Sequence, residues 1–173
     1  SLNRRYDEFV MPRLETFGDH HPETVGLSGL RRMIRRYRSP GAFSVAELNY
    51  NHDARADIVL GVTEYLLVAQ RGYKGRTEAA RLRGWAKSVR PPDLKSVAIH
   101  GFGLAGFQYL RMLFGANTVK PDRHILKFVA KTIGRRVSAI DALRLLEDAS
   151  REVGFPIRNV DYALWEAAAR RAR

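Results

Sequence analysis

The sequence predicts an all-α protein, and three observations support this prediction. Apolar side chains recur at helical spacing along most of the chain, whereas no segment shows the strict alternation that is typical of a β-strand. Clusters of Gly, Pro and Ser separate the helical segments. Apolar residues make up 45% of the 173 residues, which is enough for a hydrophobic core in one globular unit or two small lobes.

The first half of the chain contains three expected helices. Residues 4–16 carry apolar side chains at helical spacing, and the segment 18–22 interrupts them. Residues 24–38 form the second helix, and the Ser-Pro-Gly segment 39–41 is expected to be a turn. Residues 54–70 are apolar on nearly every side, so we expect this third helix to be buried at the centre of the molecule.

Caps and turn residues divide the second half of the chain. Thr77 is expected to cap one helix, and the pair Ser138 and Asp141 resembles a capping box at the start of another. A short helix precedes the segment around Ile99, and the last helix contains Trp165. These expected helices span residues 77–87, 94–97, 104–114, 122–133, 139–152 and 160–169.

The formal net charge of +12 indicates a polyanionic partner, and nucleic acid is the first candidate. The most basic helix places Arg31, Arg35 and Arg38 along one face. Two plainer interpretations stay open. The arginines form a solvated surface, or they reflect the base composition of the genome.

The composition also excludes several kinds of site. With no cysteine, the chain forms no disulfide, no thiolate zinc site and no Cys-ligated iron–sulfur cluster. No apolar run is long enough to span a membrane, and residues 1–7 have no apolar stretch behind their charges. We therefore expect a cytoplasmic monomer, associated with the nucleoid if the source is bacterial, with no cofactor, no metal bound by side chains and no membrane partner.

Residues 99–106, Ile-His-Gly-Phe-Gly-Leu-Ala-Gly, are the most informative stretch of the chain. The Gly-x-Gly pattern of Gly101 and Gly103 precedes an apolar helix. Such a turn exposes backbone N–H groups that bind an anion, usually a phosphate. Further along, Pro121-Asp122-Arg123-His124 places an acid at the start of the next helix. The alternative is an ordinary turn between helices, followed by a capping Asp.

Together these two motifs resemble the helix-hairpin-helix (HhH-GPD) superfamily of DNA glycosylases. Ile99, Gly101 and Gly103 match the family's hairpin, and Asp122 and His124 match its Asp-x-His segment. The resemblance implies that the partner is double-stranded DNA, from which the protein excises a damaged or mispaired base after flipping it out of the stack. The DNA-binding residues that it implies are His100, Gly101, Phe102, Gly103, Ala105, Gly106, Lys120 and Arg123.

The resemblance also implies a fold in which one HhH-GPD-like unit, residues 1–173, is a two-lobed helical bundle. Lobe A would cover about residues 40–120, with the helix-hairpin-helix motif at 94–114. Lobe B would combine about residues 1–38 with 121–173. Hairpins of this family often hold a monovalent cation through backbone carbonyls, so such a cation is a further expectation.

Three departures from the family pattern limit the chemistry. Ala105 stands where bifunctional members have the Lys that forms a Schiff base, so the resemblance implies a monofunctional glycosylase that uses water. Gly106 and Phe107 replace a small hydroxyl residue and Ala, so Phe107 fills the lobe or reshapes the pocket. The cysteines that hold a cluster in some members are absent.

Asp122 is the expected catalytic carboxylate, because an ionised acid beside C1′ stabilises the positive charge that develops on the sugar and orients a water. A helix cap without catalysis is the plainer interpretation of Asp122. Glu47, Tyr50 and Asn51 are candidates for the base pocket, with Glu47 as a donor of a proton to a purine leaving group. Further candidates for stacking on the flipped base, each of which can equally be a core residue, are Tyr65, Tyr73, Trp85 and Phe102.

Three functions remain open at this level. The first is a monofunctional DNA glycosylase, and the second is a DNA-binding protein of the same fold without catalysis. The third is a helical interaction protein whose charge is incidental. The lesion is also open among alkylated purines, mispaired adenine and deaminated bases.

Overall fold

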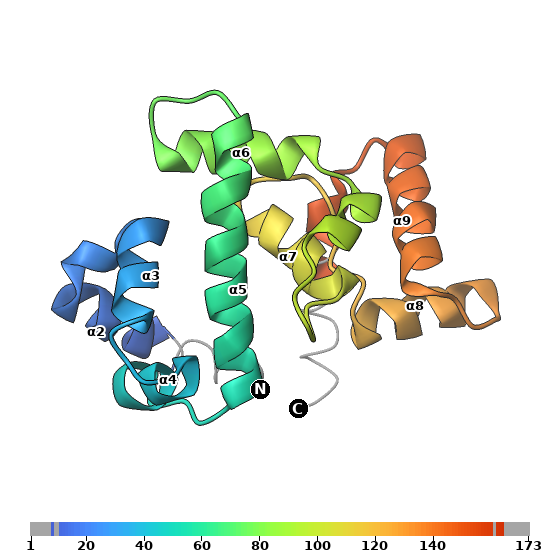
Figure 1. Cartoon of the computed structure of the whole chain (residues 1–173). Helices are drawn as coiled ribbons and strands as arrows, with labels where there is room; N and C mark the ends of the chain where they lie inside the picture. The colour runs from blue at the N-terminus through green and yellow to red at the C-terminus, as the bar shows by residue number, and fades with distance from the viewer. Residues whose placement is uncertain (1–7, 9–10, 161, 165–173) are drawn as a thin grey trace. The chain divides into compact units, whose positions relative to one another are not determined.

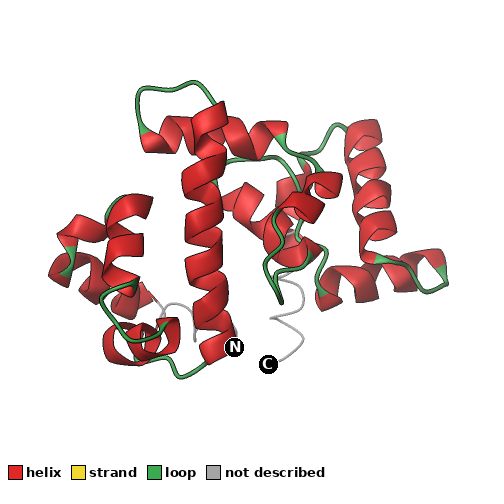
Figure 2. Cartoon of the chain, viewed as in Figure 1, coloured by secondary structure: helices red, strands yellow, loops and turns green. Residues whose placement is uncertain are grey.

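The computed structural model describes residues 8, 11–160 and 162–164. These residues contain helices and no β-strand, which confirms the expected all-α class (Figure 1, Figure 2). The α-helices include α2 (Met11–His20), α3 (Leu27–Ile34), α4 (Pro40–Leu48), α5 (Asp53–Ala69), α6 (Glu78–Ser88), α7 (Leu104–Leu113), α8 (Arg123–Ile133) and α9 (Ala139–Val153), and the 3₁₀ helices are η2 (Pro22–Thr24), η3 (Gln70–Gly72) and η4 (Pro91–Ser96). Residues 157–160 and 162–164 are helical as well.

The chain divides into two compact units. One contains Ser1–Leu82 together with Ile99–Gly101, and the other contains Arg83–Ala98 together with Phe102–Arg173. The chain therefore passes from one unit to the other within α6 and again in the turns on either side of Ile99–Gly101. This division differs from the expected lobes, in which the first 38 residues were grouped with the C-terminal helices.

One buried cluster of the first unit lies between α3 and α4. Met33 and Ile34 of α3 form a buried cluster with Phe43 of α4. Phe17 of α2 and Leu60 of α5 pack against this cluster. Leu30 also packs against the cluster, so the face of α3 that carries Leu30, Met33 and Ile34 is the buried one.

The expected turn at 39–41 is instead the first turn of α4. The Ser39 hydroxyl accepts a hydrogen bond from the Ala42 N–H at 3.1 Å, and Pro40 follows at a position where its fixed φ suits a helix and no donor is lost. Gly41 lies against α5, where an added Cβ would approach Asp53 Oδ1 to 1.9 Å. The three residues that suggested a turn are thus a cap, a helix-starting proline and a glycine required by close packing.

Other expected boundaries shift by a few residues. Helix α2 continues through Gly18 to His20, and the expected short helix at 94–97 is the 3₁₀ helix η4, which begins at Pro91. Helix α5 is half-buried rather than buried on every side, since Val59 and Val68 are exposed. The expected helical residues 4–7, 9–10, 161 and 165–169 lie outside the described residues.

The second unit is built on α8 and α9. Ile125 and Val129, one helical turn apart on α8, pack with Leu143 and Leu146 of α9. Asp122 caps α8, and Ser138 caps α9 by accepting the Asp141 N–H. The Ser138 cap of the predicted capping box is thus present, whereas the Asp141 carboxylate accepts from the Ser138 hydroxyl, at 2.6 Å, in place of the backbone N–H of a full capping box.

None of the helices within the described residues combines the length and apolar character needed to cross a lipid bilayer.

Candidate functional site

The turn before α7 is held by close packing and by two residues with left-handed backbone. Ala98 has φ +48° and Gly101 has φ +76°. Ile99, between them, packs against α5, where a Cβ added at Gly61 would lie 3.2 Å from the Ile99 side chain. The left-handed conformation suits Gly101 but costs free energy at Ala98, so the local packing must compensate for it.

The start of α7 has no side-chain cap. Gly103 occupies the N-cap position in an extended conformation, and it has no side chain to accept a hydrogen bond from the first N–H groups of the helix. Gly103 is exposed, whereas Ala105 and Gly106 are half-buried. An uncapped helix start next to an exposed glycine is the arrangement that lets a phosphate approach backbone donors.

The aromatic residues around this turn pack inward. The Phe102 ring covers Gly106 so closely that an added Cβ would lie 2.9 Å from Phe102 Cε2. Phe107 is fully buried and meets the edge of Trp85 with ring centroids 6.0 Å apart. Phe107 and Trp85 are therefore core residues, so Phe107 fills the unit and Trp85 offers no surface for a flipped base. Gly106 is a glycine because Phe102 occupies the space of a side chain.

Asp122 begins α8 as its N-cap. Its Oδ1 accepts hydrogen bonds from the N–H groups of His124, at 2.9 Å, and Ile125, at 3.2 Å. Its Oδ2 lies 3.5 Å from Lys120 Nζ, and 28% of the side chain is exposed. Arg123 is exposed, and its Nε lies within hydrogen-bonding distance of His124 Nε2 at 3.3 Å. The structure thus brings together Lys120, Asp122 and Arg123, three of the residues predicted for the site.

The remaining predicted residues belong to the first unit. His100 and Gly101 are exposed in the turn, and Asn51 is exposed before α5. Tyr50 stacks on His52 with ring centroids 6.0 Å apart, and its hydroxyl accepts a hydrogen bond from Arg55 Nη1 at 2.6 Å.

Glu47 lies in a hydrogen-bonded cluster that the sequence did not reveal. Its Oε2 lies 2.7 Å from His21 Nε2, and the Tyr37 hydroxyl donates to its Oε1. His21 Nδ1 in turn lies 3.8 Å from the Glu23 carboxylate. The hydrogen bond from Tyr37, reinforced by His21, holds the pKa of Glu47 below its usual value. A proton donor needs a raised pKa instead, so these contacts argue against Glu47 as the acid that protonates a purine.

The chain belongs to a domain family of unknown function, DUF8548, whose model matches residues 55–169. That range includes the turn before α7 and the Asp122 cap. No curated protein and no solved structure matches the chain.

The lowered pKa of Glu47 predicts how stability depends on pH. The carboxylate stabilises the fold above the ordinary pKa of 4.5, and this contribution is lost as the pH falls through the lower folded value. Glu47→Gln should therefore lower the free energy of unfolding at neutral pH. The difference in this free energy between the variant and the unmodified protein should become smaller in acid. Urea unfolding over a pH series measures both. The exposed Glu15→Gln is the matched control, and a gap that widens in acid would contradict the assignment.

Two substitutions separate the cap of α8 from the charge of Asp122. Asp122→Ala removes the acceptor of two N–H groups and should destabilise the protein by about 1 kcal/mol. Asp122→Asn keeps a good N-cap acceptor, so its free energy of unfolding should stay within roughly 0.5 kcal/mol of the original. Chemical denaturation measures both values. Equal losses in the two variants would mean that the ion pair with Lys120, not the cap, is the stabilising contact.

Proposed function

We propose that this chain is a monofunctional DNA glycosylase of base-excision repair, which hydrolyses the N-glycosidic bond of a damaged or mispaired base flipped out of double-stranded DNA. The observation that carries the proposal is the arrangement of Asp122. One carboxylate oxygen is committed to the start of α8, and the other points away from the cap toward Lys120. The cap orients the carboxylate, and the second oxygen is the one that would face a substrate.

The proposed reaction follows from that orientation. The bond from C1′ to the base nitrogen breaks, its electron pair leaves with the base, and positive charge develops on the sugar. The Asp122 carboxylate stabilises that charge by electrostatic attraction. A water attacks C1′ and gives its proton to the carboxylate, and the departing base takes a proton from solvent. The products are a free base and an abasic site.

The turn and the charge of the chain support DNA as the substrate. The uncapped start of α7 offers backbone N–H groups to a phosphate, a contact that positions a strand without reading its sequence. The net charge of +12 favours association with a polyanion. Ala105, at the start of α7, has no amine, so no imine forms there and the strand stays intact after base loss.

A second candidate is a DNA-binding protein of the same kind without catalysis. The observation that favours it is that both oxygens of Asp122 already have partners, namely two backbone N–H groups and Lys120. A purely structural acid needs no more than these contacts.

The test of the proposal is base release from duplexes that each contain one alkylated purine, deaminated base or mispaired adenine. We expect release from at least one duplex, with strand breaks only after alkali. Asp122→Asn should lower the rate by about 100-fold or more, because the carboxylate acts on the reacting atoms. The same variant should bind DNA with unchanged affinity and salt dependence, since the cap is kept.

Three results would contradict the proposal, each in a different part. Release that is equally fast in Asp122→Asn would remove Asp122 from the reaction. Salt-sensitive DNA binding without release from any duplex would favour the non-catalytic DNA-binding protein. Strand breaks before alkali treatment would instead contradict the monofunctional class.

A further inference from the structure

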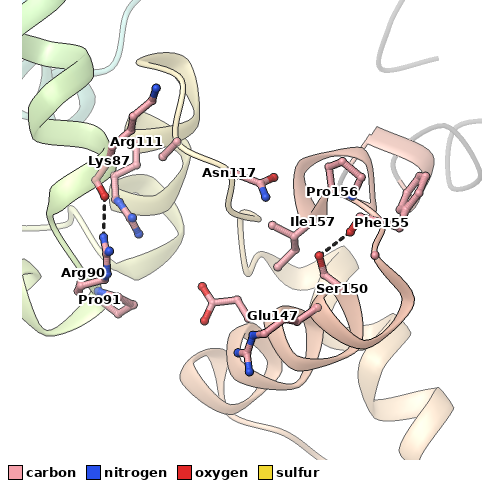
Figure 3. A pocket seen from close by; sticks show the side chains of 13 residues that line it. Lys87, Arg90, Pro91, Arg111, Asn117, Glu147, Ser150, Phe155, Pro156 and Ile157 are labelled. Atoms are coloured by element: carbon pink, nitrogen blue, oxygen red, sulfur yellow. Dashed lines mark hydrogen bonds between the residues drawn. The ribbon is translucent and has the colours of Figure 1, made fainter.

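The second unit contains a polar pocket of about 660 Å³ that is distinct from the turn before α7 and from Asp122. Its walls are the end of α6, the start of η4, the second half of α7, the loop after it, and the end of α9 with the segment that follows. Figure 3 shows the Arg111 guanidinium and the Glu147 carboxyl directed into this space from α7 and α9. Its cationic lining residues are Lys87, Arg90, Arg111 and Arg151.

Arg111 is a fixed cation in the wall of this pocket. Only 5% of the residue is exposed, and its Nε donates to the Ala86 carbonyl at 3.1 Å. Its Nη1 donates to Gln108 Oε1 at 2.6 Å. Neither bond uses Nη2, so one edge of an otherwise buried guanidinium still has donors for a ligand. Among the described residues no carboxylate forms an ion pair with Arg111, and Glu147 and Asp93 attract its charge only at longer range. Burying a charge without a direct ion pair is costly, which makes an anionic ligand a suitable partner for that edge.

A second guanidinium strengthens the preference for an anion. Arg90 is held by hydrogen bonds from its Nη1 to the carbonyls of Lys87, at 2.7 Å, and Ser88 and Val89, at 3.0 Å each. Burial lowers the pKa of Arg111, and repulsion from Arg90 lowers it further. A phosphate between the two guanidinium groups would relieve that repulsion, and Arg binds phosphate through two parallel hydrogen bonds.

Glu147 supplies the opposite chemistry in the same pocket. Within the part of the chain that the structure describes, Glu147 makes no ion pair, and burial raises the pKa of its carboxyl. It also lines a neighbouring pocket of about 490 Å³, whose other residues include Leu94, Leu104, Ile140 and Leu143. Glu147 and Pro91 line both pockets, so the two adjoin. An acceptor therefore stands between a cationic pocket and a largely apolar one.

We propose that these adjoining pockets bind a phosphate monoester whose organic part has an apolar face and a hydrogen-bond donor, as a nucleoside 5′-monophosphate does. The phosphate lies on Arg90 and Arg111, a donor of the base reaches Glu147, and the apolar face of the ring enters the second pocket. Each pocket by itself lies in the size range of small-molecule sites. The ester is either a free nucleotide or the 5′-phosphate end of a nucleic-acid strand.

The test is isothermal titration calorimetry of the full chain with the four nucleoside 5′-monophosphates. The comparison ligands are inorganic phosphate and the corresponding nucleosides. We expect saturable one-to-one binding of at least one nucleotide, and affinities at least tenfold weaker for phosphate alone and for the nucleoside. Oligonucleotides with and without a 5′-phosphate distinguish the source. If the 5′-phosphorylated oligonucleotide binds more tightly than the free nucleotide and the 5′-hydroxyl form does not, the ligand is a strand end.

Variants link that binding to the pocket. Arg111→Met should weaken nucleotide binding by about tenfold or more, because it removes charge-assisted hydrogen bonds. The exposed Arg135→Met removes the same charge outside both pockets and should leave the affinity within about twofold. Glu147→Gln should weaken nucleotide binding roughly threefold without weakening the binding of inorganic phosphate, since only the base contacts this carboxyl.

Lys87→Met keeps the test decisive if Arg111→Met does not fold, because Lys87 is exposed and its replacement should not disturb the fold. This variant should weaken nucleotide binding about threefold. The proposal is overturned if no nucleotide and no 5′-phosphorylated oligonucleotide binds saturably. It is equally overturned if Lys87→Met and Glu147→Gln both leave the affinity unchanged. Neither outcome depends on base release, so the proposal stands or falls separately from the glycosylase.

Discussion

The hydrogen bonds that the Asp122 carboxylate accepts from the first N–H groups of α8 are the contact on which the rest of the second unit depends. They satisfy two N–H groups that the helix itself leaves unpaired. They also set the position from which Ile125 and Val129 reach the core of the second unit. The same contact orients the carboxylate, so one interaction starts the helix and positions the proposed catalytic group.

The second general feature of the chain is its excess of positively charged over negatively charged residues. The chain has 30 Lys and Arg against 18 Asp and Glu, and the described ion pairs of its arginines lie mostly at exposed positions. Such pairs contribute little to stability. The arginines are therefore not explained by ion pairs that hold the fold together. Arg111 is the clearest case, because its guanidinium is buried and still has unused donors facing a pocket.

Features determined by neighbouring residues were predictable from the sequence. The helical class, the Ser138 cap and the Asp122 cap all depend on residues within four positions of one another, and each is present in the structure. Helix α4 was not predicted, because Pro40 and Gly41 are typical of turns as well as of helix starts. Only the close approach of Asp53 to Gly41 explains why this glycine lies in a helix.

Contacts between residues that are far apart in the chain could not be predicted from the sequence. His21 and Glu47 are 26 positions apart, so nothing in either segment indicated their pairing. The burial of Trp85 against Phe107, and the pocket formed by Arg90, Arg111 and Glu147, likewise depend on how helices pack. The sequence carried only a weak indication of these sites. Glu47 is a Glu two turns into a helix and Arg111 is an isolated Arg among apolar residues, and both patterns are common.

The most direct test of the central claim is the affinity of the protein for a duplex with one cationic pyrrolidine abasic analogue, compared with the same duplex carrying a neutral tetrahydrofuran. The pyrrolidine mimics the charge that develops on the sugar, and an enzyme binds such a mimic more tightly than a neutral one. If Asp122 stabilises that charge, the unmodified protein prefers the pyrrolidine duplex by tenfold or more, and Asp122→Asn loses the preference while still binding both duplexes. Equal affinity of the unmodified protein for the two duplexes would contradict the account.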